Sequence, residues 1–169
     1  MNFDIRPAFT EDLETIVEFN MELALESESL HLDPRKVRRG VEKPLADPSL
    51  GRYYVAHRGD EILGQIQVTV EWSDWNDAEY WWIQNVYVVP SARRQGIYRA
   101  LHNYVMNLAE RAGACRLQLY VDAKNAAAQA VYKKLNMVQS DYLIFEQMEE
   151  QTEKPGKRSS TKPGNQTPS

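Results

Sequence analysis

Residues 86–101 constrain what this chain can fold into more than any other stretch. They begin with β-branched and aromatic residues typical of a buried strand, stop at Pro90, pass two arginines and Gly96, and continue with the apolar spacing of a helix. A strand that turns through a glycine-containing loop into a helix brings free backbone N–H groups and fixed positive charge together. The sequence therefore predicts a site for a phosphate-bearing ligand at this loop.

The length and composition indicate one globular domain. The chain has 169 residues, 43% of them hydrophobic, which is enough for a packed core. No apolar run approaches the roughly 18 residues of a membrane span, and the first residues lack the basic start and apolar core of a secretory signal. Cys115 is the single cysteine, so it has no intrachain disulfide partner. We expect a cytoplasmic protein with no membrane association.

Charge separates the chain into an acidic body and a basic tail. Residues 151–169 contribute +3 to a net charge of −4, which leaves −7 on residues 1–150. An acidic body disfavours a nucleic-acid partner; it is compatible with a cationic substrate, although solubility alone is the simpler explanation. We predict one domain over residues 1–148. The tail, residues 149–169, is rich in polar residues, Pro and Gly and is predicted to be disordered.

Apolar periodicity predicts strands and helices in alternation. Thr10 is expected to cap the first helix, and Asp33 and Pro34 to begin a second helix that ends near Pro44. Hairpins in the middle of the chain and one helical crossover predict a mixed sheet with helices on both faces. The predicted strands span residues 3–6, 52–57, 61–72, 79–88, 116–121 and 142–148, and the later helices span residues 97–112 and 125–135, with Gly113 as the helix-ending glycine.

Two motifs match the pattern of a known family. Arg93-Arg94-Gln95-Gly96-Ile97-Tyr98 resembles the Q/R-x-x-G-x-G/A loop of the GNAT superfamily of N-acetyltransferases, and residues 125–137 are similar to its N-x-x-A-x-x-x-Y-x-x-x-G-F signature. The resemblance covers residues 3–148 and includes the order of strands and helices. It implies an α/β fold of the α+β type, in which a mixed, mostly antiparallel sheet of six to seven strands is flanked by four helices.

The resemblance also implies acetyl-CoA as the acetyl donor, with no metal. Loop N–H groups would hold the pyrophosphate, and backbone groups of Val86 and Val88 would pair with the pantetheine as an added strand does. Tyr132 would protonate the departing thiolate, since a phenol with a pKa of ~10 stays protonated at neutral pH; the alternative is a packing role on an apolar helix face. The expected cofactor contacts are Val86, Val88, Arg93, Arg94, Gln95, Gly96, Ile97, Tyr98, Arg99, Asn125, Ala128 and Tyr132, with Asn125 either a helix cap, a contact or both.

Three positions depart from the family pattern. Tyr98 stands where the family prefers Gly or Ala, so its side chain either points into the sheet or reshapes the cofactor mouth. Asn136 and Met137 replace Gly-Phe, a mild change because Asn tolerates the left-handed backbone of a helix end. Gln84 and Asn85 stand where several members carry the acid that serves as general base. Amides can orient a water or a substrate but cannot take a proton.

The base that deprotonates the acceptor amine is therefore left open. Glu79 begins the strand that contains Gln84, and it is a candidate for direct or water-mediated proton removal. Water relayed past Gln84, or an amine that arrives already neutral, would serve equally well. The other candidates are Glu71, Asp74, Glu26, Glu28 and His31.

Acidic and aromatic residues gather in the segments that the family uses for its acceptor, namely the first two helices and the loop around residues 72–75. Aromatic rings beside carboxylates suit a cationic amine through cation–π contact and charge pairing. Trp81 and Trp82 are instead expected to fill the two faces of a buried strand. The expected substrate contacts are Glu26, Glu28, Trp72, Asp74, Trp75 and Asn85.

Together these features predict an N-acetyltransferase that transfers the acetyl group of acetyl-CoA to the primary amine of a small cationic acceptor, by direct attack in a ternary complex. Acetylation of a protein N-terminus or an aminoacyl-tRNA is one alternative, and a CoA-binding regulatory module without turnover is another. The family makes a homodimer a further expectation. Cys115 is expected to be a small buried residue and His102 a helix-surface residue, and the three histidines show no metal-ligand spacing.

Overall fold

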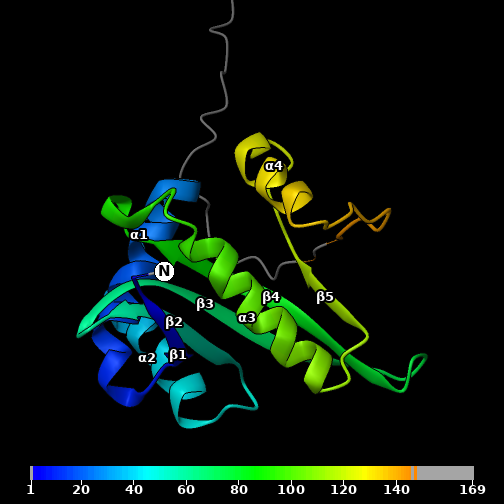
Figure 1. Cartoon of the computed structure of the whole chain (residues 1–169), viewed down its shortest axis with the longest axis horizontal. Helices are drawn as coiled ribbons and strands as arrows, with labels where there is room; N and C mark the ends of the chain where they lie inside the picture. The colour runs from blue at the N-terminus through cyan, green and yellow to red at the C-terminus, as the bar shows by residue number, and fades with distance from the viewer. Residues whose placement is uncertain (1, 146, 148–169) are drawn as a thin grey trace, which may run out of the picture. The chain divides into compact units, whose positions relative to one another are not determined.

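A computed structural model describes residues 2–145 and 147 (Figure 1). The chain divides into one unit that ends at Met137 and another that begins at Val138. The predicted disordered tail lies outside the described residues. The helices and strands all belong to the first unit: β1 (Asp4–Pro7), η1 (Thr10–Asp12), α1 (Leu13–Glu28), α2 (Pro34–Ala46), β2 (Arg52–Arg58), β3 (Glu61–Ser73), β4 (Ala78–Val88), η2 (Pro90–Ala92), α3 (Ile97–Arg111), β5 (Arg116–Leu119) and α4 (Ala126–Lys134).

The described strands form a single sheet in the order β1-β2-β3-β4-β5. The first four pair antiparallel, and β5 pairs parallel to β4 after the α3 crossover, which confirms the mixed sheet, the four helices and the α+β class. The prediction of six to seven strands is wrong: within the described residues the sheet has five.

The predicted last strand accounts for this difference. Residues 142–145 form no strand, and residues 146 and 148 lie outside the described part of the chain. The Tyr142 N–H donates to Ser140 Oγ at 3.0 Å. Such a local side-chain bond satisfies a backbone group without a neighbouring strand, and periodicity alone does not reveal this competition.

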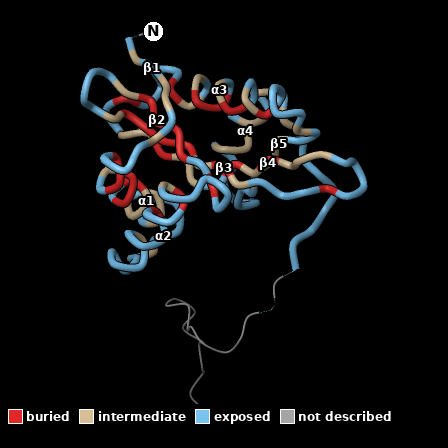
Figure 2. The backbone as a smooth tube through the Cα atoms, turned by 90° about the horizontal axis from the view of Figure 1, so that it is seen from below, coloured by how far each residue is buried: buried red, intermediate tan, exposed pale blue. Residues whose placement is uncertain are grey.

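The sheet has a helix-covered core on each face, and the buried backbone in Figure 2 follows the sheet and the helix sides that meet it. Helix α3 packs on one face, called here the α3 face, where Leu101 and Val105 meet Ile66 and Trp81. Helices α1 and α2 cover part of the opposite face, called here the α1 face. Its core is formed by Leu13, Ile16, Val17, Val41, Tyr53 and Val55.

Local sequence signals set most of the helix ends. The Asp33 side chain accepts the Arg35 N–H at 2.9 Å and begins α2, and Gly113 adopts a φ of +76° just after α3. The expected cap at Thr10 is wrong, because Thr10 begins a short 3₁₀ turn and α1 begins after Asp12. Pro44 lies within α2, which continues to Ala46.

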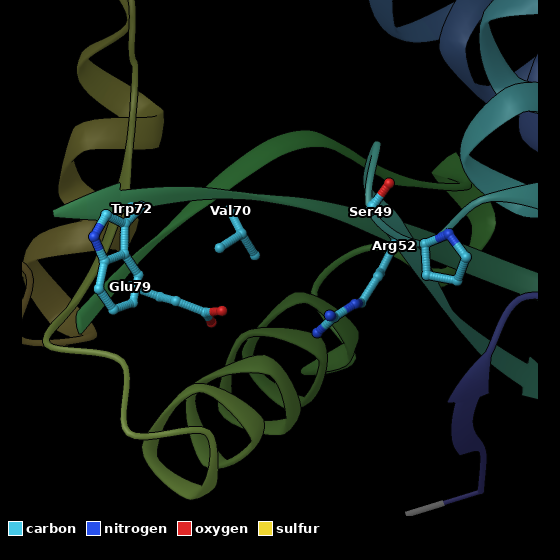
Figure 3. Close-up of a pocket in the computed structure, with 6 residues that line it drawn as sticks. Ser49, Arg52, Val70, Trp72 and Glu79 are labelled. Carbon is cyan, nitrogen blue, oxygen red and sulfur yellow. The ribbon is translucent and has the colours of Figure 1, made fainter. Parts of the chain in front are cut away.

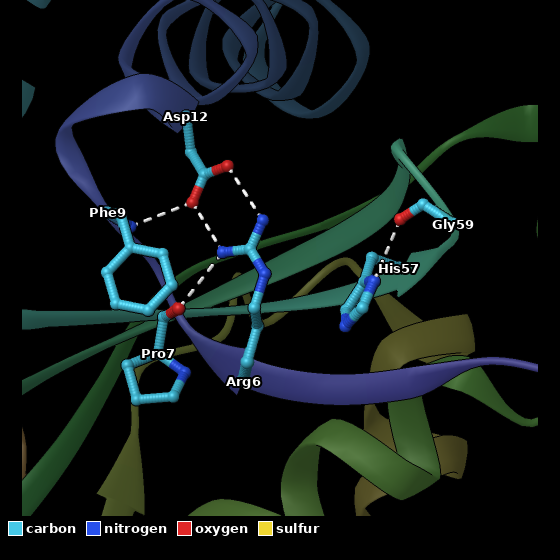
Figure 4. Close-up of polar contacts among 6 residues, drawn as sticks. All are labelled: Arg6, Pro7, Phe9, Asp12, His57 and Gly59. Carbon is cyan, nitrogen blue, oxygen red and sulfur yellow. Dashed lines mark hydrogen bonds and ion pairs between the residues drawn. The ribbon is translucent and has the colours of Figure 1, made fainter.

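A bidentate ion pair fixes the entry into α1 (Figure 4). Arg6 of β1 donates from Nη1 to Asp12 Oδ2 at 2.7 Å and from Nη2 to Oδ1 at 2.9 Å, and the Phe9 N–H donates to Asp12 Oδ2 at 2.8 Å. Burial opposes ionisation of Asp12, but these hydrogen bonds and the Arg6 charge outweigh it and hold the pKa of the carboxyl below its usual value. The pair therefore ties α1 to the edge of the sheet.

Replacing Asp12 by Ala should lower the free energy of unfolding by about 2–3 kcal/mol, because it leaves Arg6 and the Phe9 N–H without their shared acceptor. Urea denaturation followed by circular dichroism measures the change. Glu42→Ala is the control, since its 3.8 Å pair with Arg38 is exposed and should contribute about 0.5 kcal/mol or less. Equal losses of stability in the two variants would contradict a special role for the partly buried Arg6–Asp12 pair.

Candidate active site

The pairing of β4 with β5 stops before β4 ends. The last parallel pair is Ile83 with Leu119, whereas β4 continues to Val88. The Val89 N–H donates back to Leu63 of β3 at 3.0 Å, so by strand alternation the backbone groups of Val86 and Val88 face away from β3. In the described part of the chain no strand pairs with them. Residues 84–88, called here the open edge of β4, can accept an extended ligand as an additional strand.

A β-bulge lies at the start of this open edge. Val68 pairs with Ile83 and Ile66 with Val86, so Gln84 and Asn85 together face one residue of β3. A bulge re-aims neighbouring side chains and is common beside active sites. Gln84 Nε2 donates to Thr69 Oγ1 at 2.8 Å, and Asn85 Nδ2 donates to Gln67 Oε1 at 3.0 Å. Both amides are thereby held in fixed orientations.

The loop between η2 and α3 has the geometry of an anion site. Arg94 and Gly96 adopt φ values of +63° and +83°, and the first helical bond runs from the Ala100 N–H to the Gly96 oxygen. The preceding N–H groups, of Ile97, Tyr98 and Arg99, have no intrahelical acceptor, and no side chain caps them. A Cβ at Gly96 would meet no atom within 4 Å. The loop thus leaves both donors and space for a phosphate group.

Arg93 is committed to neighbouring protein groups. Its guanidinium forms an ion pair with Glu26 at 2.7 Å, its Nε donates to the Val88 oxygen at 2.9 Å, and it lies over the Tyr87 ring. Tyr87 also donates its hydroxyl to Glu26 at 3.3 Å. Arg93, which was expected to contact phosphate, and Glu26, which was expected to contact the substrate, are thus paired with each other. This pair links the end of α1 to the end of β4.

Tyr132 lies on α4, which begins with the cap that the sequence predicts. The Asn125 side chain accepts the Ala128 N–H at 3.0 Å. The Tyr132 ring packs edge-on against the Tyr98 ring, with centroids 6.1 Å apart and an interplanar angle of 65°. Burial raises the pKa of the Tyr132 phenol above its ordinary value, so the phenol remains a proton donor at neutral pH.

Tyr98 points toward α4 and contacts two other rings. His102 lies one helical turn further along α3, with ring centroids 6.2 Å apart. The Tyr98 hydroxyl is buried without a hydrogen-bond partner in the described residues, and burial together with the nearby Tyr132 raises its pKa strongly. The expectation that His102 lies on the helix surface is wrong: it is 5% exposed, and burial lowers its pKa.

An acidic and aromatic cluster lies on the same sheet face as Gln84. Trp82 pairs with Thr69, and its Nε1 donates to Glu71 Oε2 at 2.6 Å. The Trp82 ring stacks on Tyr120 with centroids 4.5 Å apart. Trp81 is 2% exposed and fills the core as predicted, but Trp82 is half-buried and its ring belongs to this cluster. The sequence alone does not reveal Thr69 and Tyr120 as site residues, because Thr69 meets Gln84 through the β3–β4 pairing and Tyr120 meets Trp82 only where β5 pairs with β4.

Glu79 lies on the opposite side of the sheet from Gln84. It accepts from Trp81 Nε1 at 2.8 Å, and Trp81 packs in the core on the α3 face. Figure 3 shows the Glu79 carboxylate on a shallow pocket with Trp72 and Arg52. The pocket has a volume of about 310 Å³ and is lined by Pro48, Ser49, Arg52, Val70, Trp72 and Glu79. The sheet therefore separates two predicted site residues, Glu79 and Trp72, from the Gln84 amide.

Several other predicted residues lie on the exposed surface. Trp75 is 92% exposed in the β3–β4 turn beside Asp74, and Glu28 and His31 are exposed at and after the end of α1. The expectation that Cys115 is buried is wrong: it is exposed, with its Sγ 3.5 Å from the backbone carbonyl oxygen of Glu79.

Residues 2–145 and 147 contain neither a metal-binding cluster nor a membrane-spanning helix. No group of three or more His, Cys, Asp or Glu side chains is arranged to hold a metal ion there. No helix in the same residues combines the length and apolarity that crossing a bilayer requires.

Comparison with known proteins identifies the class to which this fold and loop belong. The model of the acetyltransferase (GNAT) family matches residues 13–137. The chain belongs to this family and is an acyltransferase. A solved structure of a possible acetyltransferase from Clostridium difficile 630 is 39% identical, with a TM-score of 0.83 over 88% of this chain and 98% of that one. The search of curated proteins gave no match.

Two more distant structures share the fold. One is AAC(6')-Iy in complex with the bisubstrate analog CoA-S-monomethyl-acetylneamine, 18% identical with a TM-score of 0.74, over 88% of this chain and 99% of that one. The other is a ribosomal-protein-alanine N-acetyltransferase from Brucella melitensis biovar Abortus 2308, 16% identical with a TM-score of 0.71, over 86% of this chain and 98% of that one. The same fold therefore serves chemically different acceptors.

Gly96→Ala should weaken acetyl-CoA binding about tenfold, because its methyl group would occupy the space beside the unpartnered helix N–H groups. Isothermal titration measures the dissociation constant. Gly59→Ala is the matched control: Gly59 also has a positive φ and open space at its Cβ, but it lies in the β2–β3 turn. Both variants carry backbone strain of about 1 kcal/mol, so equal affinities would refute the cofactor role of the loop.

Proposed function

We propose that this acyltransferase transfers the acetyl group of acetyl-CoA to the primary amine of a small cationic acceptor, by direct attack in a ternary complex. The observation that carries the proposal is the α3 N-terminus, where three N–H groups without helical acceptors follow directly on the open edge of β4. The GNAT family uses acetyl-CoA. The residues of this chain fit that donor, because the loop offers space, positive charge and backbone donors.

Binding of the donor is assigned to two neighbouring segments. The N–H groups of Ile97, Tyr98 and Arg99 hold the pyrophosphate, assisted by the exposed arginine side chains at 94 and 99. The open edge of β4 pairs with the pantetheine through Val86 and the Val88 N–H. A ligand held at both places has its thioester fixed beside the bulge, and such positioning supplies several kcal/mol of the rate acceleration.

The acceptor is assigned to the face that carries Trp82 and Glu71. A carboxylate next to stacked aromatic rings attracts an ammonium group by charge and by cation–π contact. Glu71 also shares this face with Gln84, whereas Glu79 faces the other side of the sheet. We therefore assign proton removal from the amine to Glu71, through a water that Gln84 orients.

The remaining proton is assigned to Tyr132. The ammonium group first passes one proton to Glu71 through the water. The neutral nitrogen then bonds to the acetyl carbon, the carbon–sulfur bond breaks, and the sulfur takes the Tyr132 hydroxyl proton as CoA leaves. The second proton of the nitrogen returns to the Tyr132 oxygen. Burial raises the pKa of Tyr132, so the phenol is protonated and its hydroxyl is available as a donor when the thiolate forms.

A panel of amines tests the proposed function. Release of the CoA thiol should accompany acetylation of small amines that carry a second positive charge, and peptide N-termini should react more slowly. Tyr132→Phe should lower kcat at least ~100-fold with acetyl-CoA affinity retained, since it removes only the acid. Preference for peptides would reassign the acceptor, and unchanged turnover in Tyr132→Phe would remove its assigned role.

Glu71→Gln should lower kcat/KM ~10- to 100-fold at neutral pH. Raising the pH should reduce this difference in kcat/KM between variant and wild type, because the free acceptor then loses its own proton. Steady-state rates with the best amine of the panel, measured from pH 7 to pH 9.5, give the profile. Glu79→Gln is the control, because that carboxylate lies on the α3 face. A larger loss for Glu79→Gln than for Glu71→Gln would reverse the assignment.

A further inference from the structure

Three aromatic side chains form a continuous row from α3 to α4. His102 is nearly fully buried on α3, and the Tyr98 ring packs against both the His102 ring and the Tyr132 ring. The centroid separations are 6.2 Å on the His102 side and 6.1 Å on the Tyr132 side. Both contacts are edge or tilted arrangements, the geometry that aromatic pairs favour.

Helix α4 has little other anchorage near Tyr132. Its residues 126–134 include no buried residue, and its cap at Asn125 is a bond within its own first turn. Among the described aromatic residues, Tyr98 is the one whose ring contacts Tyr132. The direction of the Tyr132 phenol therefore depends on a side chain from another helix.

We propose that Tyr98 is a positioning residue that holds the Tyr132 phenol in the orientation needed to protonate the leaving thiolate; this inference rests on the function proposed above. The Tyr98 ring makes the contact with the Tyr132 ring, and the His102 ring packs against the Tyr98 ring. A Gly or Ala at position 98 would leave the space between α3 and α4 unfilled. The bulky Tyr98 side chain therefore acts by packing against α4, the helix that carries Tyr132.

The hydroxyl of Tyr98 is not required for this role. It is buried and has no hydrogen-bond partner in the described residues, so it carries the cost of a desolvated polar group. Tyr98→Phe keeps the ring and removes that group. It should therefore lose far less kcat than Tyr98→Ala and unfold at the same temperature as the wild type or above it.

The experiment compares Tyr98→Ala and Tyr98→Phe in acetyl transfer with the best amine of the panel. Tyr98→Ala should lower kcat ~10- to 100-fold while the KM for acetyl-CoA changes less than about threefold, because misplacement of a catalytic group affects the chemical step. In a Tyr132→Phe background, Tyr98→Ala should cost less than about twofold, since the acid it positions is already absent. Tyr104→Ala is the matched control, as Tyr104 lies on the same helix and packs on Tyr54.

A second measurement does not depend on turnover. In the full chain carrying ¹³C-labelled tyrosine, the Tyr132 ring signals should shift and broaden in Tyr98→Ala and stay in place in Tyr98→Phe and Tyr104→Ala. A wild type inactive on every amine refutes the proposed function, and the NMR result still decides the positioning role. Unchanged Tyr132 signals in Tyr98→Ala overturn the inference. It is also overturned if Tyr98→Phe loses as much kcat as Tyr98→Ala, or if Tyr98→Ala costs as much in the Tyr132→Phe background as in the wild type.

Discussion

The early end of the β4–β5 pairing determines the layout of the whole site. Because β5 leaves β4 after Ile83, five residues of β4 present one side of their backbone without a partner strand. The same strand then enters the loop whose glycine allows α3 to begin with unpartnered N–H groups. In the described sheet β4 lies between β3 and β5, and its Trp81 and Ile83 side chains anchor it in the core on the α3 face.

A second constraint is the link between distant parts of the chain at the end of β4. Arg93 contacts both the Val88 oxygen and Glu26, which lies more than sixty residues earlier on α1. Helix α1 is thereby linked to the start of the segment that joins β4 to α3. Arg93 and Glu26, each expected to contact a ligand, are instead paired with each other on the exposed surface.

Features that depend on local chain geometry could be predicted from the sequence. The loop at Gly96, the cap at Asn125 and the end of α3 at Gly113 each follow from a few adjacent residues. Features that depend on register could not. The bulge at Gln84 breaks the simple alternation of β4, and Glu71 and Glu79, which the sequence leaves as comparable candidates, lie on opposite faces. His102 lies one helical turn after Tyr98, so their contact follows from local spacing, but its burial depends on tertiary packing that helical periodicity does not reveal.

The contact between Arg93 and the Val88 oxygen has a consequence for solubility. An unpaired strand backbone inside a sheet can template pairing with a second chain, which leads to aggregation. Here the last acceptor of that backbone is already occupied by a charged side chain, and the bulge twists the other end away from a regular ladder. The open edge of β4 therefore offers a few backbone groups to a narrow ligand. It lacks the regular row of hydrogen-bond partners that a full strand of a second chain needs.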